Sequence, residues 1–84
     1  MIVRVLLFAR AKDLAGVGSM SLELPEGATV AELRQALAVT YPRLGEFLPR
    51  CAVAVGGEIV GDATALVEGA EVALLPPVSG GAIG

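Results

Sequence analysis

A capped helix in the middle of the chain is the feature that most constrains the fold. Residues Thr29 to Glu32 have the spacing of a capping box, in which a hydroxyl and a carboxylate accept hydrogen bonds from backbone N–H groups at the start of a helix. Pro42 then ends the helical pattern, because proline lacks the N–H that a helix requires. Between these signals runs a single apolar stripe for packing on a sheet. It consists of Val30, Leu33, Leu37 and Tyr41.

Strand patterns lie on both sides of this helix. An apolar run and an alternating run precede it and predict a hairpin, and three shorter runs follow it. A hairpin followed by a helix and further strands is the order of elements in a β-grasp, or ubiquitin-like, fold. We therefore predict an α+β domain over residues 1–75, with a mixed sheet packed on one main helix, and a flexible tail over residues 76–84. The predicted strands are Ile2–Phe8, Met20–Leu24, Ala52–Val55, Glu58–Val60 and Glu71–Leu75, and the predicted connections include Arg10–Gly18, the loop Arg43–Arg50 and the tight turn Gly56–Gly57.

Alternation within the strands predicts which side chains point away from the core, because successive residues of a strand face opposite sides of a sheet. If the odd-numbered residues of the first strand enter the core, Phe8 points outward. In the last strand, Leu75 lies on the opposite face from Val72 and Leu74. We therefore expect apolar side chains on the outer face of the sheet.

The charge pattern and the missing residue types exclude several classes of function. Six basic and nine acidic residues give a net charge of −3, and the basic residues are scattered along the sequence, so we expect no nucleic acid as a partner. The chain has no histidine, which removes nucleophilic catalysis by Ser/His or Cys/His pairs. The acidic residues lack the spacing of a metal-binding loop. No apolar run approaches the ~20 residues of a membrane-spanning helix, so we expect no membrane partner.

The single cysteine, Cys51, limits the chemistry further. It cannot form an internal disulfide or a cysteine-rich metal site. A chain of this kind is typical of the reducing cytoplasm. Because no activating group lies near Cys51 in the sequence, we expect it to be a small buried hydrophobic residue at the start of a strand.

The end of the chain carries no charged side chain after Glu71. Pro76 and Pro77 favour an extended path, which would hold the following residues clear of the domain. Gly80-Gly81 has no side chains, so it can enter a narrow channel in another enzyme and bring a carboxyl group to a reactive centre. The plainer alternative is a frayed terminus. We expect the tail to be the working part of the protein.

These segments together resemble the small subunit of molybdopterin synthase, a family of ubiquitin-like sulfur carriers. The resemblance depends above all on Glu68–Gly81, in which a strand of the pattern acidic-Gly-x-Glu-Val runs into Pro-Pro-Val-Ser-Gly-Gly. It implies a sulfur-donor subunit of a heterotetrameric synthase in molybdenum cofactor biosynthesis, rather than an enzyme on its own. Supporting matches are Val5–Ala9, Leu14–Gly16, Thr29–Leu33 and Ala52–Val55.

The resemblance also implies a chemical step at Gly81. In that family an adenylating, E1-like enzyme uses ATP to activate the terminal glycine carboxylate, and a sulfur donor then converts it to a thiocarboxylate. The tail enters the large synthase subunit, where the active site lies, and its sulfur passes to cyclic pyranopterin monophosphate, two sulfurs per dithiolene. On this basis Gly81 carries the sulfur, Gly80 provides clearance, and the protein binds no permanent cofactor or metal.

The same family docks on its partners through an apolar sheet face and the tail. The alternative is that the apolar members of this set complete the core. Because Ala82-Ile83-Gly84 follows Gly81 and would block its carboxylate, we expect those three residues to be removed before activation. The positions that match the docking surface are Phe8, Lys12, Ile59, Leu75, Pro76, Pro77 and Val78.

Three other functions are compatible with the sequence. A sulfur carrier of the thiamine-pathway type, or a ubiquitin-like protein modifier, would share the fold and the activated glycine. A ubiquitin-like interaction module would never use its C-terminus. Deletion of Gly80 and Gly81 would abolish the first two activities and leave the third intact.

Overall fold

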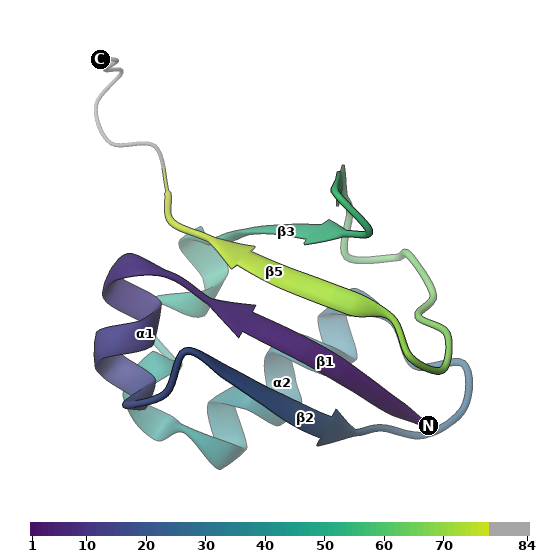
Figure 1. Ribbon diagram of the computed structural model, residues 1–84, viewed down its shortest axis with the longest axis horizontal. Helices are drawn as coiled ribbons and strands as arrows, with labels where there is room; N and C mark the ends of the chain where they lie inside the picture. Colours follow the sequence, from purple (N-terminus) through teal and green to yellow (C-terminus); the bar gives the residue numbers. More distant parts are fainter. Residues whose placement is uncertain (78–84) are drawn as a thin grey trace.

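A five-stranded mixed sheet, with strand order β2-β1-β5-β3-β4, forms the centre of the computed structural model, which describes residues 1–77 (Figure 1). This is the α+β, β-grasp arrangement that the sequence predicts, and all five predicted strands are present. The elements in order are β1 (Ile2–Leu7), α1 (Ala9–Ala15), β2 (Ser19–Glu23), α2 (Val30–Thr40), η1 (Pro42–Leu44), η2 (Leu48–Arg50), β3 (Ala52–Val55), β4 (Glu58–Val60) and β5 (Glu71–Leu75).

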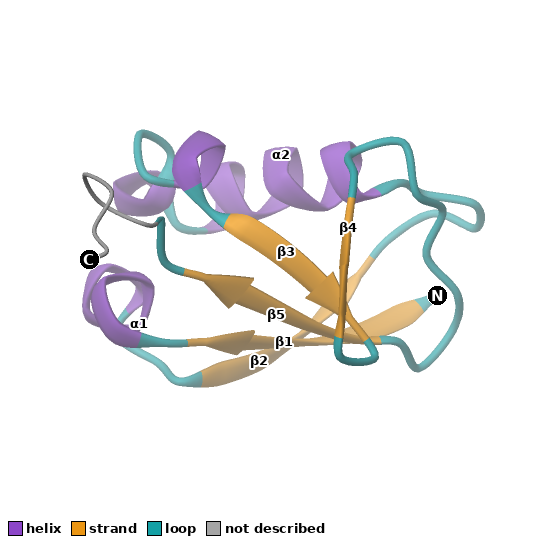
Figure 2. Cartoon of the chain, turned by 90° about the horizontal axis from the view of Figure 1, so that it is seen from above, coloured by secondary structure: helices purple, strands orange, loops and turns teal. Residues whose placement is uncertain are grey.

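The central strands β1 and β5 pair in parallel, although they are the first and last strands of the chain. β2 pairs antiparallel with β1, and β3 pairs antiparallel with both β5 and β4. Parallel neighbours require a long crossover connection, and here that connection includes α2, which covers one face of the sheet (Figure 2). The C-terminal ends of β1 and β5 therefore lie side by side at one end of the molecule, next to α1 (Figures 1 and 2).

The capping box begins α2, as the sequence predicts. The Thr29 N–H donates to Glu32 Oε1 at 2.9 Å, and the Glu32 N–H donates to Thr29 Oγ1 at 3.4 Å. The helix ends at Thr40, before Pro42. The apolar stripe faces the sheet, with Val30, Leu33 and Leu37 fully buried and Tyr41 partly buried.

The core between the sheet and α2 consists of aliphatic side chains. Alternation assigns the strand faces correctly: Val3, Val5 and Leu7 are buried, and Phe8 is 45% exposed. No polar or charged side chain is buried among residues 1–77. Within the same residues, neither α1 nor α2 combines the length and the apolar composition that crossing a membrane requires.

One predicted connection is in fact a helix. The sequence predicts a simple connection over Arg10–Gly18, but this is wrong, because α1 forms there. Gly16 closes the helix in the left-handed conformation, with φ of 81°, and its N–H donates to the Lys12 carbonyl at 2.8 Å. A helix of seven residues is too short to show apolar periodicity. The loop predicted over Arg43–Arg50 likewise contains η2 and most of η1.

We expect the substitution Thr29→Ala to lower the free energy of unfolding by about 1 kcal/mol, because the Glu32 N–H loses its acceptor at the start of α2. For a domain of this size, such a loss lowers Tm by roughly 4–8 °C. Thermal unfolding followed by circular dichroism measures the change.

The matched control is Thr40→Ala in the last turn of the same helix. The Thr40 hydroxyl only donates to the Ala36 carbonyl at 2.9 Å, so its loss leaves no backbone donor without a partner. Equal decreases in Tm for the two variants would contradict the capping role of Thr29.

Candidate functional site

An apolar surface covers half of the outer face of the sheet, which is the face turned away from α2. The strand register assigns its members, because alternate residues of a strand point to opposite faces. Contiguous apolar side chains on the open face of a sheet are candidate sites of interaction with other proteins. One row of this surface consists of Ile59 (β4), Ala54 (β3), Ala73 (β5) and Leu6 (β1), and the next consists of Ala52 (β3) and Leu75 (β5). These six residues, together with Phe8, are named here the apolar outer surface. Of its members, Ile59 and Phe8 are exposed, Ala54 is 7% exposed, and the other four are partly buried.

The other half of the outer face is mostly polar, although Ile2 of β1 is an exposed apolar residue there. Arg4 of β1 pairs with Ser21 of β2 and with Glu71 of β5, and all three side chains are exposed. Arg4 and Glu71 precede Leu6 and Ala73 along their parallel strands. The apolar outer surface therefore lies toward the C-terminal ends of β1 and β5, where the chain leaves the sheet (Figure 1).

Phe8 lies at the edge of the apolar outer surface, and its backbone is fixed at the start of α1. Its carbonyl accepts a hydrogen bond from the Ala11 N–H at 3.0 Å. Ala9 adopts the left-handed conformation with φ of 49°, which is uncommon for a residue with a side chain, so the chain turns sharply directly after Phe8. Lys12, on the same helix, is exposed, and its Cε lies 3.5 Å from where a Cβ on Gly18 would be.

The structure brings the predicted docking residues to one region of the surface. Ile59 is 70% exposed and Phe8 is 45% exposed, so these two do not complete the core. Leu75 is partly buried at the end of β5, where Pro76 is exposed. Their role in docking stays a prediction. Pro77 is the last residue that the structure describes, and the predicted site residues Val78, Gly80 and Gly81 lie outside the described residues.

Sequence reasoning missed part of this surface. Leu6 lies on the same face as Phe8, so alternation alone could have identified it. Ala54 and Ala73 join it only because the register places them between Leu6 and Ile59. That register depends on how distant strands pair, and no local pattern in the sequence reports it.

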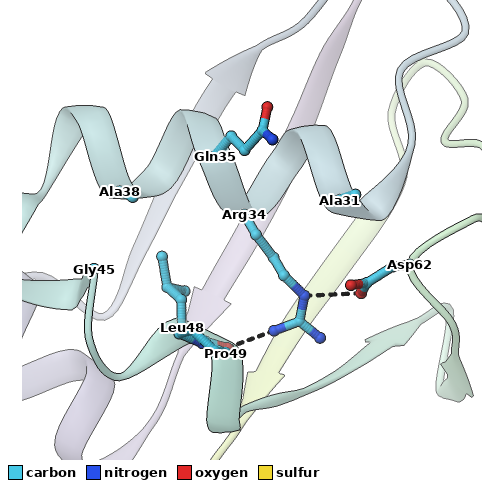
Figure 3. Close-up of a pocket in the computed structure, with 8 residues that line it drawn as sticks. All are labelled: Ala31, Arg34, Gln35, Ala38, Gly45, Leu48, Pro49 and Asp62. Atoms are coloured by element: carbon cyan, nitrogen blue, oxygen red, sulfur yellow. Dashed lines mark hydrogen bonds and ion pairs between the residues drawn. The ribbon is translucent and has the colours of Figure 1, made fainter.

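A concave region lies on the other side of the molecule from the apolar outer surface, beside α2, and has a volume of about 420 Å³ (Figure 3). The Arg34 side chain crosses it: its Nε donates to Asp62 Oδ1 at 2.9 Å, and its terminal nitrogen donates to the Leu48 carbonyl. These contacts connect α2 to η2 and to the segment after β4. We assign Arg34 a structural role, because the guanidinium is already paired and the side chain is only 18% exposed.

Cys51 follows η2 and is 4% exposed, which confirms the prediction that it is a buried hydrophobic residue. Burial raises the pKa of the Cys51 thiol above its ordinary value, and the charge of Arg34 opposes this shift. The thiol donates to the Phe47 carbonyl at 3.5 Å. Because the thiolate is the reactive form, a buried thiol with a raised pKa is a poor nucleophile at neutral pH.

We expect Cys51 in the folded protein to react with a thiol-specific reagent markedly more slowly than in denaturant at the same neutral pH, because burial both raises the thiol pKa and blocks access of the reagent. The rate in the folded protein should continue to rise with pH beyond the ordinary range of a free thiol. Absorbance of the released chromophore measures both rates. Equal rates in the folded and unfolded protein would show that the thiol is accessible and reactive.

The chain matches the model of the ThiS family over residues 5–81. It is 37% identical over 81 residues to the molybdopterin synthase sulfur carrier subunit of Chlamydomonas reinhardtii, and the match covers 94% of this chain and 98% of that protein. It is 35% identical over 79 residues to the molybdopterin synthase sulfur carrier subunit of Arabidopsis thaliana, covering 94% of this chain and 82% of that protein.

Solved structures show the same fold. The small archaeal modifier protein 1 of Haloferax volcanii is similar with a TM-score of 0.82 and 29% identity, covering 92% of this chain and 98% of that one. The complex of subunits 1 and 2 of the molybdopterin-converting factor from Helicobacter pylori 26695 contains a similar chain, with a TM-score of 0.69 and 28% identity. That match covers 96% of this chain and 100% of that one.

Proposed function

The chain belongs to the ThiS family, and on that premise we propose that it is the sulfur carrier subunit of a molybdopterin synthase. The observation that carries the proposal is the similarity of 94% of the chain to sulfur carrier subunits of that enzyme. The position of the apolar outer surface gives further support, because it lies at the end of the sheet from which the tail departs.

The proposed chemistry takes place at the Gly81 carboxylate. A carboxylate is a poor electrophile, so an adenylating enzyme first joins it to the α-phosphate of ATP, and pyrophosphate leaves. Hydrosulfide released by a sulfur donor then attacks the acyl carbon, AMP leaves, and loss of the S–H proton gives the thiocarboxylate. Gly80 has no side chain, so the tip can pass through a narrow channel. The step requires a free carboxylate at Gly81, so Ala82-Ile83-Gly84 is removed first.

The large subunit then receives the tail and supplies the active site. The thiocarboxylate sulfur is a soft nucleophile, and binding of the tail places it next to cyclic pyranopterin monophosphate, which converts a bimolecular encounter into a positioned reaction. Each dithiolene takes its two sulfurs from two carriers. The Helicobacter pylori complex of subunits 1 and 2 supports a partner of this kind for a similar chain.

Docking uses the apolar outer surface. Ile59 and Phe8 are the most exposed of its large side chains, and their burial against a partner removes apolar area from water. Lys12 lies on α1, the helix that Phe8 precedes, and we propose that it contributes a charge at the rim of the interface. Rim charges of this kind affect the rate of association more than the final affinity.

A second candidate function is protein modification. The observation that favours it is the similarity to the small archaeal modifier protein 1 of Haloferax volcanii. The acyl-adenylate at Gly81 would be the same, but a lysine amine of a target protein would attack it, so that an amide forms and AMP leaves. Conjugates recovered from the native host would favour this function, and a complex with the large subunit of the synthase favours the first.

We expect a variant that ends at Gly81 to gain one sulfur in place of one oxygen when it is mixed with the adenylating enzyme, ATP and a sulfur donor. Intact mass spectrometry measures the gain. The matched control is the chain that ends at Gly84, which should not react, because its Gly81 carbonyl is part of a peptide bond. Absence of the thiocarboxylate from the Gly81-ended variant would contradict the proposed function.

We expect Ile59→Asp to weaken binding to the large subunit by about tenfold or more, because it places an unpaired carboxylate within an apolar interface. Val39→Asp is the matched control: Val39 is also an exposed apolar residue, at 81%, but it lies on α2. Isothermal titration calorimetry with the Gly81-ended chain measures both affinities. Equal affinities for the two variants would show that docking does not use the apolar outer surface.

A further inference from the structure

Three arginines that are far apart in the sequence gather around one surface hollow. Arg10 lies on α1, Arg43 lies on η1 and Arg50 lies on η2. The hollow has a volume of about 340 Å³, and half-buried Leu14 and Phe47 also line it. The fold therefore brings together three basic residues that are 33 and seven positions apart in the sequence, so their grouping could not be predicted from the sequence order.

These arginines have no intramolecular partner in the part of the chain that the structure describes. Within residues 1–77, the ion pairs join the N-terminus to Glu26 and Arg34 to Asp62, and none involves the arginines of the hollow. All three side chains are exposed. Glu46 is the one acidic residue among those that line the hollow, so the site carries excess positive charge in a protein of net charge −3.

The acidic residues lie mostly at the opposite end of the molecule. They gather around the N-terminus, the start of β5 and the start of α2, whereas α1 and the η1–η2 segment lie at the other end (Figure 2). The charge of the protein is therefore polarised along the sheet. The acidic residues of that far end are Glu23, Glu26, Glu32, Glu58, Asp62, Glu68 and Glu71.

The end of the molecule that carries the three arginines is also the end where the chain leaves β5. Arg10 is two residues from Phe8, on the helix that begins directly after the apolar outer surface. The C-terminal ends of β1 and β5 lie at the same end (Figures 1 and 2). A protein that covers the apolar outer surface and receives the tail is thus brought next to Arg10, one of the three arginines that line the hollow.

We propose that this hollow binds carboxylate side chains of the synthase large subunit as the subunit docks, a proposal that rests on the proposed function. Guanidinium groups suit this task, because their planar fork donates two hydrogen bonds to a carboxylate. Arg10, which lines the hollow, is two residues from Phe8 at the edge of the apolar outer surface, so contacts at the hollow would form at the rim of the interface. There they accelerate encounter and orient the tail toward its channel.

The test compares Arg43→Gln and Arg50→Gln with Arg4→Gln, which makes the same change in net charge on the polar half of the sheet. Affinity of the Gly81-ended chain for the large subunit is measured by calorimetry at several concentrations of sodium chloride, and thermal unfolding checks that each variant folds. Each hollow variant should bind about threefold more weakly at low salt and show a shallower dependence of log Kd on log salt concentration. Arg4→Gln should match the unsubstituted chain.

Three other results would overturn the inference. If the hollow variants behave as Arg4→Gln does while the unsubstituted chain binds, the hollow takes no part in docking, and the proposed function stands. If the unsubstituted chain does not bind the large subunit, the proposed function fails and the inference fails with it. If phosphate binds the free chain at the three arginines but does not weaken its binding to the large subunit, the hollow is a site for a small anion and takes no part in docking.

Discussion

The parallel pairing of β1 with β5 is the interaction on which the rest of the structure depends. It joins the first strand to the last, so α2 must cross over the sheet to connect them, and the core forms beneath that crossover. The same pairing sets the C-terminal end of β5 beside the end of β1. The turn at Phe8, the start of α1 and the departure of the tail are therefore brought together by one strand pair.

Much of this architecture could be predicted from local patterns. The capping box at Thr29 and the stripe that ends at Tyr41 identify α2, because both depend on residues within a few turns of each other. Alternation identifies the strands and assigns Phe8 to the outer face. α1 could not be predicted in this way, since it is short and its first residue, Ala9, adopts the left-handed conformation, which no local pattern in the sequence indicates.

The parts of the site that escaped prediction are those created by distant contacts. The apolar outer surface depends on the register of four strands, and the hollow of Arg10, Arg43 and Arg50 depends on packing between α1 and the η1–η2 segment. Cys51 is buried and its thiol pKa is raised, so the internal sulfur of the chain is poorly suited to transfer. The proposed account therefore places the transferable sulfur on the tail and uses the folded domain to deliver it.

The most direct test of this account is a single-turnover reaction between the Gly81 thiocarboxylate, the synthase large subunit and cyclic pyranopterin monophosphate. Mass spectrometry follows the carrier while the pterin product is assayed for its dithiolene. The account predicts that the thiocarboxylate returns to a carboxylate as the dithiolene forms, with two carriers consumed for each product. A carrier that keeps its sulfur in this mixture, or that loses it without forming dithiolene, would contradict the account.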